Sequence, residues 1–136
     1  MILKLDFDSD IPIYLQIRNQ IIIGIANKEL KDGYELPSVR LLAGDIGVNM
    51  HTVNKSYSIL KEEGYIKMDR RKGAVISLNL DNTNDQFIEK LNEDMKLYIA
   101  ECINRGIKIE TLKENFKEIF DMYKEEKWKC QNQFIL

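Results

Sequence analysis

Five hydrogen-bonding side chains lie within seven residues of this chain, at the start of one helical pattern. They are Asn49, His51, Thr52, Asn54 and Lys55. Short polar side chains on one rigid face can exchange hydrogen bonds with the edges of a flat partner. They are too unlike one another for a metal site, and a single histidine argues against a His-based metal site or a catalytic dyad. The cluster therefore predicts recognition of a partner.

The other residue types that carry chemistry show no catalytic spacing. Cys102 and Cys130 form no short CxxC pair, so the sequence predicts two reduced structural thiols. The chain also lacks a glycine-rich phosphate loop and a nucleophile motif. We therefore expect a protein that is not an enzyme and that uses neither a cofactor nor a metal.

Two short helices separated by a glycine must position the polar cluster. Ser38 favours the start of a helix over 38–46, and Gly47 favours its end in a left-handed conformation. A second helix is predicted over 50–63, with an apolar stripe at three- and four-residue spacing. The stripe consists of Val53, Tyr57 and Leu60. The polar cluster falls mostly on the other side of this helix.

A further helix precedes this pair and a β-hairpin follows it. Isoleucines at four-residue spacing predict a helix over 11–28. Residues 65–68 and 74–78 are typical of two strands joined by the turn DRRKG. The hairpin therefore carries three adjacent cations at its tip.

Two amphipathic helices are predicted after a polar linker, over 84–105 and 110–126. Their apolar stripes contain Phe87, Leu91, Met95, Tyr98, Leu112, Phe116, Ile119, Phe120 and Tyr123. Two short helices bury little apolar surface alone, so we expect them to pack against the same helices of a second copy. The tail over 128–136 has no clear period, and no role is assigned to it.

Charge is distributed unevenly along the chain. Residues 1–80 contain 11 Lys/Arg and 10 Asp/Glu, a net charge of +1, whereas residues 81–136 contain 9 and 12, a net charge of -3. The positive charge gathers in the predicted hairpin. The N-terminus does not read as a secretory signal and no apolar run approaches the length of a membrane span, which predicts a cytoplasmic protein without membrane association.

The order helix, helix, glycine turn, helix, hairpin is that of a winged helix-turn-helix. The predicted fold is therefore mainly α with a small β-hairpin. A winged helix-turn-helix DNA-binding domain over 1–80 is followed by a short two-helix dimerisation region over 81–136. In this motif the N-terminal residues of the third helix lie at base edges in the DNA major groove. Asparagine can pair there with adenine, and lysine with guanine.

Three segments of the sequence also resemble a known family. "IPIYLQIRNQI", "LPSVRLLAGDIGVNMHTVNKSYSILKEEGYI" and "RRKGAVI" are similar to the DNA-binding domain of GntR-family bacterial transcription regulators. The short remainder is similar to the YtrA-type subfamily. The resemblance implies a homodimer on a double-stranded DNA operator of inverted symmetry, with repression as the expected effect. A small-molecule effector could shift the dimer between spacings that match or mismatch the operator.

The fold and the resemblance together predict a DNA-binding site at the second helix, the recognition helix and the wing. It consists of Ser38, Arg40, Asn49, His51, Thr52, Asn54, Lys55, Arg70, Arg71, Lys72 and Gly73. The chain departs from the family in two places. The wing lacks the first glycine of the frequent Arg-Arg-Gly-x-Gly, and Met50 stands where some relatives have arginine, so the family's base preference does not transfer.

Two alternatives compete with parts of this interpretation. The chain could be a winged-helix protein-interaction module without a specific DNA site, which predicts weak binding that ignores DNA sequence. Phe116, Phe120 and Tyr123 could line an effector pocket, although their helical spacing favours a dimer core.

Overall fold

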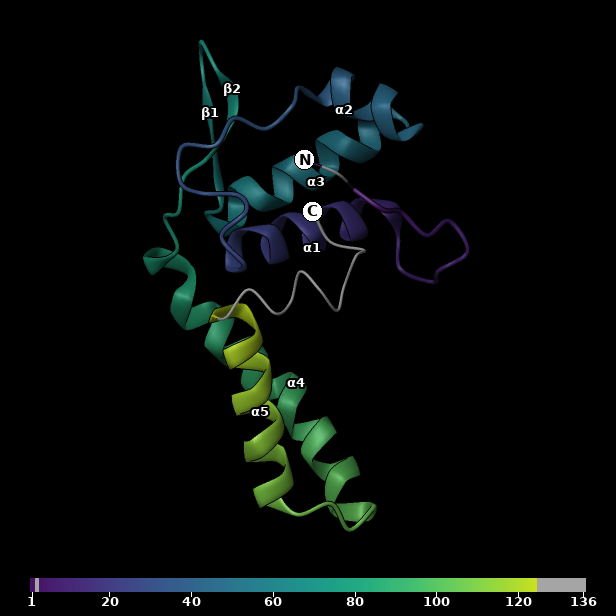
Figure 1. Cartoon of the computed structure of the whole chain (residues 1–136), viewed down its shortest axis with the longest axis vertical. Helices are drawn as coiled ribbons and strands as arrows, with labels where there is room; N and C mark the ends of the chain where they lie inside the picture. Colours follow the sequence, from purple (N-terminus) through teal and green to yellow (C-terminus); the bar gives the residue numbers. More distant parts are fainter. Residues whose placement is uncertain (2, 125–136) are drawn as a thin grey trace.

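The computed structural model describes residues 1 and 3–124 and contains five α-helices, one short 3-10 helix and one hairpin in that part of the chain (Figure 1). The elements are α1 Ile13–Ala26, α2 Val39–Ile46, α3 Met50–Glu63, β1 Ile66–Asp69, β2 Gly73–Ile76, η1 Asp81–Thr83, α4 Asn84–Asn104 and α5 Ile109–Lys124. The predicted mainly helical fold with a small antiparallel hairpin is confirmed.

The predicted bounds of the elements are close to those in the structure, and the differences have local causes. Helix α1 starts after Pro12, whose carbonyl accepts the first helical hydrogen bonds, and it ends before Lys28, which has a φ of 66°. Strand β1 begins one residue later than predicted because the Tyr65 N–H still donates to the Leu60 carbonyl of α3, at 2.9 Å. The last two residues of the predicted helix over 110–126 lie outside the described residues.

Glycines end both helices of the helix-turn-helix, as predicted. Gly47 follows α2 with a φ of 69°, and Gly64 follows α3 with a φ of 92°. Gly64 has a second constraint, because a Cβ placed on it would lie 2.3 Å from the carbonyl oxygen of Asn79. The backbone at the end of α3 therefore touches the linker that leads to α4.

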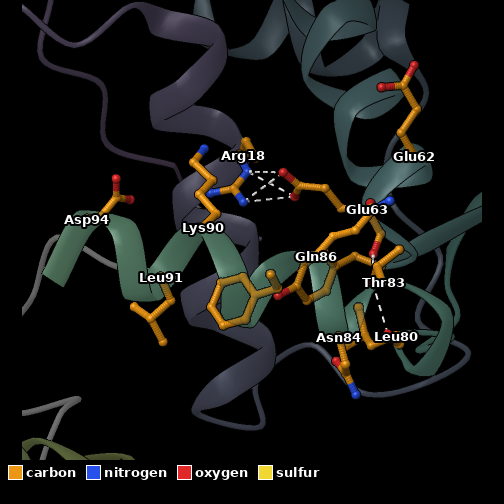
Figure 2. Close-up of a pocket in the computed structure, with 12 residues that line it drawn as sticks. Arg18, Glu62, Glu63, Leu80, Thr83, Asn84, Gln86, Lys90, Leu91 and Asp94 are labelled. Atoms are coloured by element: carbon orange, nitrogen blue, oxygen red, sulfur yellow. Dashed lines mark hydrogen bonds and ion pairs between the residues drawn. The ribbon is translucent and has the colours of Figure 1, made fainter. Parts of the chain in front are cut away.

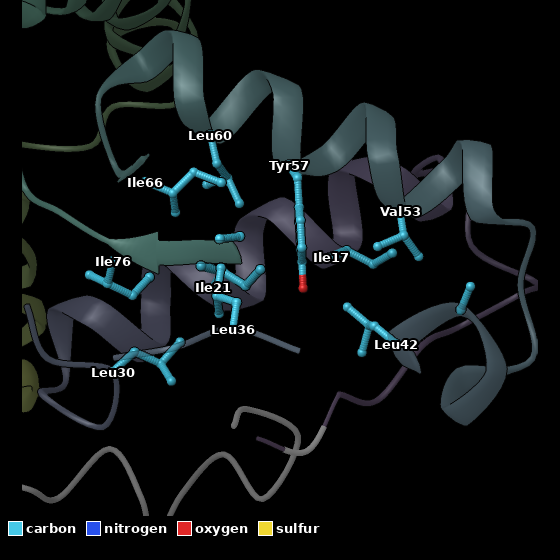
Figure 3. Packing of buried hydrophobic residues seen from close by; sticks show 12 residues of the cluster. Ile17, Ile21, Leu30, Leu36, Leu42, Val53, Tyr57, Leu60, Ile66 and Ile76 are labelled. Carbon is cyan, nitrogen blue, oxygen red and sulfur yellow. The ribbon is translucent and has the colours of Figure 1, made fainter. Parts of the chain in front are cut away.

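The core lies between α1, α3 and the hairpin (Figure 3). Ile17 and Ile21 of α1 are fully buried and meet the predicted stripe of α3. The hairpin contributes Ile66 and Ile76, which pair with each other across the two strands. The segment before α2 also pairs with β2, since the Leu36 N–H donates to the Ala74 carbonyl at 2.8 Å. This pairing fixes the base of the hairpin to the helix-turn-helix.

Two glutamines of α1 form hydrogen bonds with the N-terminal segment that precedes the helix. The side-chain amide of Gln16 donates to the Asp6 carbonyl at 2.8 Å, and its oxygen accepts from the Asp6 N–H at 2.8 Å. Gln20, one turn later, makes the same pair of bonds with Lys4. Alternate residues of the N-terminal segment thus make paired hydrogen bonds, as residues of a β-strand do. Their partners are glutamine side chains of α1 instead of the backbone of a neighbouring strand.

Ser56 is the site of a stability prediction. Its side chain is fully buried in α3, and its hydroxyl has no hydrogen-bond partner among the described residues. Replacing it with alanine removes an unsatisfied polar atom and improves helix propensity, so we expect Ser56→Ala to stabilise the protein by about 0.5–1 kcal/mol in urea unfolding. Ser58→Ala, on the exposed face of α3, is the matched control for propensity alone. A loss of stability in Ser56→Ala would show that the hydroxyl is bonded.

The helices α4 and α5 form an antiparallel arm that extends away from the core (Figure 1). Neither helix has a fully buried residue in the part of the chain that the structure describes. Among the predicted dimerisation residues, Met95, Leu112 and Tyr123 are half-buried. The others are exposed, namely Phe87, Leu91, Tyr98, Phe116, Ile119 and Phe120. The arm therefore presents a large apolar surface.

No helix within residues 1 and 3–124 is long and apolar enough to cross a membrane.

Candidate nucleic-acid interface

The predicted recognition residues lie on the exposed side of α3. Val53, at the centre of the buried stripe, is fully inaccessible, while His51 and Asn54 are exposed. A helix advances about 100° per residue, so His51 projects from the side opposite Val53, and Asn54 projects from the flank between the two sides. Thr52 lies at the border of the two faces and is half-buried. The structure thus places His51, Asn54 and Lys55 on the accessible side of α3, with Thr52 at its border.

Ser38 and Asn49 serve as helix caps. The hydroxyl oxygen of Ser38 accepts from the Leu41 N–H at 3.1 Å, and the side-chain oxygen of Asn49 accepts from the His51 N–H at 2.7 Å. These bonds satisfy backbone donors at the starts of α2 and α3. Each side chain keeps hydrogen-bond donors for an external acceptor, which suits contact with phosphate more than reading of a base.

Lys55 has an aromatic partner that the sequence analysis missed. Its ammonium nitrogen lies 3.9 Å from the centre of the Tyr14 ring on α1. A cation over an aromatic face is attracted by the ring, and this attraction restricts the rotamers of the lysine side chain. No sequence pattern pairs residues 41 positions apart, so only the packing of α1 on α3 reveals this contact.

Arg40 is exposed in the first turn of α2. The ion pairs among the described residues join Arg18 to Glu63 and Lys96 to Glu93, and none involves Arg40 or Asp45. The entry to α2 is fixed by Tyr57, whose buried hydroxyl donates to the Pro37 carbonyl at 2.7 Å. Burial raises the pKa of Tyr57 well above its usual range, so this donor stays protonated. The Arg40 guanidinium therefore projects from a rigid helix start.

The wing tip is organised by Asp69. One carboxylate oxygen of Asp69 accepts from the backbone N–H of Arg71 at 2.8 Å and of Lys72 at 3.0 Å. These two hydrogen bonds are the main reason that the pKa of the Asp69 carboxyl is lowered. Arg70, Arg71 and Lys72 are exposed, and Gly73 closes the turn with a φ of 77°. Asp69 stands at the start of the turn, where an aspartate often accepts a hydrogen bond from the backbone two residues later. The sequence analysis did not use this Asx-turn signal.

Removing the Asp69 carboxylate should loosen the wing. We expect Asp69→Ala to speed hydrogen exchange at the Arg71 and Lys72 amides and to weaken DNA binding by a few-fold. Because the folded-state pKa is lowered, the carboxylate stabilises the turn at neutral pH, and this is lost as the pH falls through that pKa. An NMR titration should show both amides shifting together in acid. Asp69→Asn keeps an acceptor without a titrating group, so acid-induced shifts that persist in it would contradict this account.

A hollow of about 590 Å³ lies on another part of the molecule, between the core and α4 (Figure 2). Arg18 of α1 and Glu63 of α3 form a two-pronged ion pair beside it, with contacts of 2.8–3.2 Å. The α4 side contributes Gln86, Phe87 and Leu91. The residues considered for an effector pocket, Phe116, Phe120 and Tyr123, do not line it.

Comparison with known proteins identifies the family. The model for bacterial regulatory proteins of the gntR family matches residues 13–76. The transcriptional repressor YtrA of Bacillus subtilis is 36% identical over 118 residues, which cover 86% of this chain and 91% of that protein. This chain belongs to the GntR family. The family predicted from the sequence is confirmed, and these relatives are transcription regulators rather than enzymes, as the sequence analysis expected.

Solved structures support the same fold for this GntR-family chain. A transcriptional antiterminator from Listeria monocytogenes EGD-e has a TM-score of 0.76 and 27% identity, and the match covers 88% of this chain and 90% of that one. YtrA from Sulfolobus acidocaldarius, a GntR-family transcription factor, is 41% identical with a TM-score of 0.56, covering 69% of this chain and 99% of that one. The chain is thus a GntR-type regulator with a helix-turn-helix DNA-binding domain.

Proposed function

We propose that this regulator is a cytoplasmic homodimer that represses transcription by binding an inverted-repeat operator. Residues 1–80 bind DNA and residues 81–136 dimerise. The observation that carries this proposal is the accessible polar face of α3, mounted on a core that buries the opposite face of the same helix.

Base recognition is assigned to the start of α3. His51 and Asn54 are exposed, and the rigid helix presents them about one turn apart. Lys55, held over Tyr14, adds a cation beside them. An asparagine amide matches the N6 and N7 groups of adenine, and histidine or lysine can donate to guanine or to phosphate.

Phosphate contact is assigned to the remaining predicted residues. Arg40 and Ser38 lie at the start of α2, where the helix dipole favours an anion. The wing offers Arg70, Arg71 and Lys72 on a turn ordered by Asp69. In Figure 1 the hairpin tip and α2 both lie at the end of the molecule away from α4 and α5. DNA at that end would leave the arm accessible to a second protomer.

Dimerisation is assigned to the arm because several of its apolar side chains are exposed in the part of the chain that the structure describes. Phe116 and Phe120 are 51% and 66% exposed on α5, and Phe87 is 59% exposed on α4. An exposed apolar surface of this kind marks an interaction site, and a twofold contact between identical arms covers both copies. The twofold would set two recognition helices about 34 Å apart, one turn of DNA.

Selection of DNA from a random-sequence pool at physiological salt tests the proposal. The expected result is an enriched inverted repeat with half-sites about one helical turn apart. Reporter transcription from a promoter that contains this repeat should fall when the protein is expressed. Failure to enrich any sequence would favour the protein-interaction alternative. An increase in transcription would contradict repression but not operator binding.

Salt dependence tests the wing assignment. We expect Arg71→Ala to weaken operator binding and to lower the slope of log affinity against log salt by about one unit, because one phosphate contact is lost. Lys113→Ala removes an exposed cation from α5 and should leave the slope unchanged. Titrations at several salt concentrations measure both, and an unchanged slope for Arg71→Ala would remove that residue from the interface.

A further inference from the structure

We infer that Met50 selects thymine within each half-site by packing against the C5-methyl group of that base. The inference rests on the proposed function, because it assigns specificity to a residue of the same recognition helix. The C5-methyl group is the apolar feature that the major groove offers, and in the polar cluster only Thr52, which is half-buried, carries a methyl group of its own.

Met50 is an exposed apolar side chain at an unusual place. It is the first residue of α3, and 50% of its surface is accessible. Three residues later, Val53 is fully buried. The apolar stripe of α3 therefore continues past the edge of the core to Met50, the first residue of the helix, half of whose surface stays accessible. A single exposed apolar side chain is ordinary on a protein surface, but this one lies at the start of the recognition helix, beside the residues assigned to base contact.

The neighbours of Met50 restrict what that ligand can be. Asn54 lies four residues later, so the two side chains are adjacent on the helix. Asn49, on the other side, uses its side-chain oxygen to cap the helix at the His51 N–H. If Asn54 pairs with an adenine, Met50 reaches a neighbouring base edge. A thioether is too weak an acceptor to read that edge by hydrogen bonding, whereas its flexible, polarisable chain fits a methyl group.

The size of the effect follows from the burial of one methyl group. Burying a group of this size favours binding by about fourfold per half-site, or roughly fifteenfold for a dimer with two such contacts. The same contact would be absent for cytosine, which has no C5-methyl group, and for uracil.

Operators in which single thymines are replaced by uracil provide the test. With the selected operator, we expect wild-type protein to lose about fourfold in affinity when one particular thymine in a single half-site becomes uracil, and roughly fifteenfold when it is replaced in both half-sites. Met50→Gln keeps the length of the side chain and removes its apolar end, and it should bind thymine and uracil operators equally at that position. Met68→Ala removes another methionine, 57% exposed on β1, and should retain the thymine preference.

Two results would overturn the inference while leaving the proposed function intact. One is specific wild-type binding that is indifferent to every uracil substitution. The other is a Met50→Gln protein, folded by circular dichroism, that keeps the full thymine preference. If wild-type protein fails to distinguish the selected operator from scrambled DNA, the proposed function fails, and the inference falls with it.

Discussion

Gly64→Ala is expected to destabilise the protein by about 3 kcal/mol or more. A left-handed backbone costs a residue with a Cβ roughly 1–2 kcal/mol. The remainder comes from collision, because the added Cβ would lie 2.3 Å from the Asn79 carbonyl oxygen. That oxygen belongs to the backbone and cannot turn away as a side chain could. Relief of the collision must displace the linker or open the end of α3.

Gly47→Ala separates the two causes. Gly47 has a similar left-handed conformation, with a φ of 69°, but no atom lies within 4 Å of an added Cβ. We therefore expect Gly47→Ala to cost only about 1 kcal/mol. Urea unfolding followed by circular dichroism, at one protein concentration, measures both variants. Equal losses of stability would mean that the contact with Asn79 is unimportant.

The double variant Phe116→Glu, Phe120→Glu is expected to make the protein monomeric and to weaken operator binding by about a hundredfold or more. Both phenyl groups are exposed in the single chain, so the substitutions should leave the protomer folded. In a dimer they would bury four carboxylates without partners. Loss of the second half-site contact removes an effective-concentration advantage of roughly 10²–10⁴.

Sedimentation and binding to single half-sites complete this experiment. The double variant should sediment as a monomer and bind an isolated half-site as a wild-type protomer does. Glu114→Lys changes the charge at an exposed position on the side of α5 opposite Phe116 and Phe120, and this variant should remain dimeric. A double variant that stays dimeric would move the interface away from these residues.

The sequence predicted the elements whose causes are local. Glycines at the ends of α2 and α3, and the apolar spacing of Val53 and Tyr57, are properties of neighbouring residues. Contacts between distant residues were missed. The hydrogen bonds between Gln16 and the N-terminal segment, and the position of Lys55 over Tyr14, depend on how α1 packs in the folded protein. The DNA-contact and dimer assignments remain predictions, since they concern molecules outside the single chain.

The joint between α3 and α4 has a mechanical consequence. The Thr83 hydroxyl donates to the Glu63 carbonyl at 3.2 Å, and the Asn79 N–H donates to the Gly64 carbonyl at 2.9 Å. The recognition helix and the arm are therefore fastened at one pivot. Helix α4 has 21 residues and acts as a lever of about 30 Å. A tilt of roughly 10° at the pivot displaces its far end by about 5 Å, comparable to one and a half base-pair steps. Small changes of angle at this joint would therefore alter which half-site spacings the proposed dimer could span.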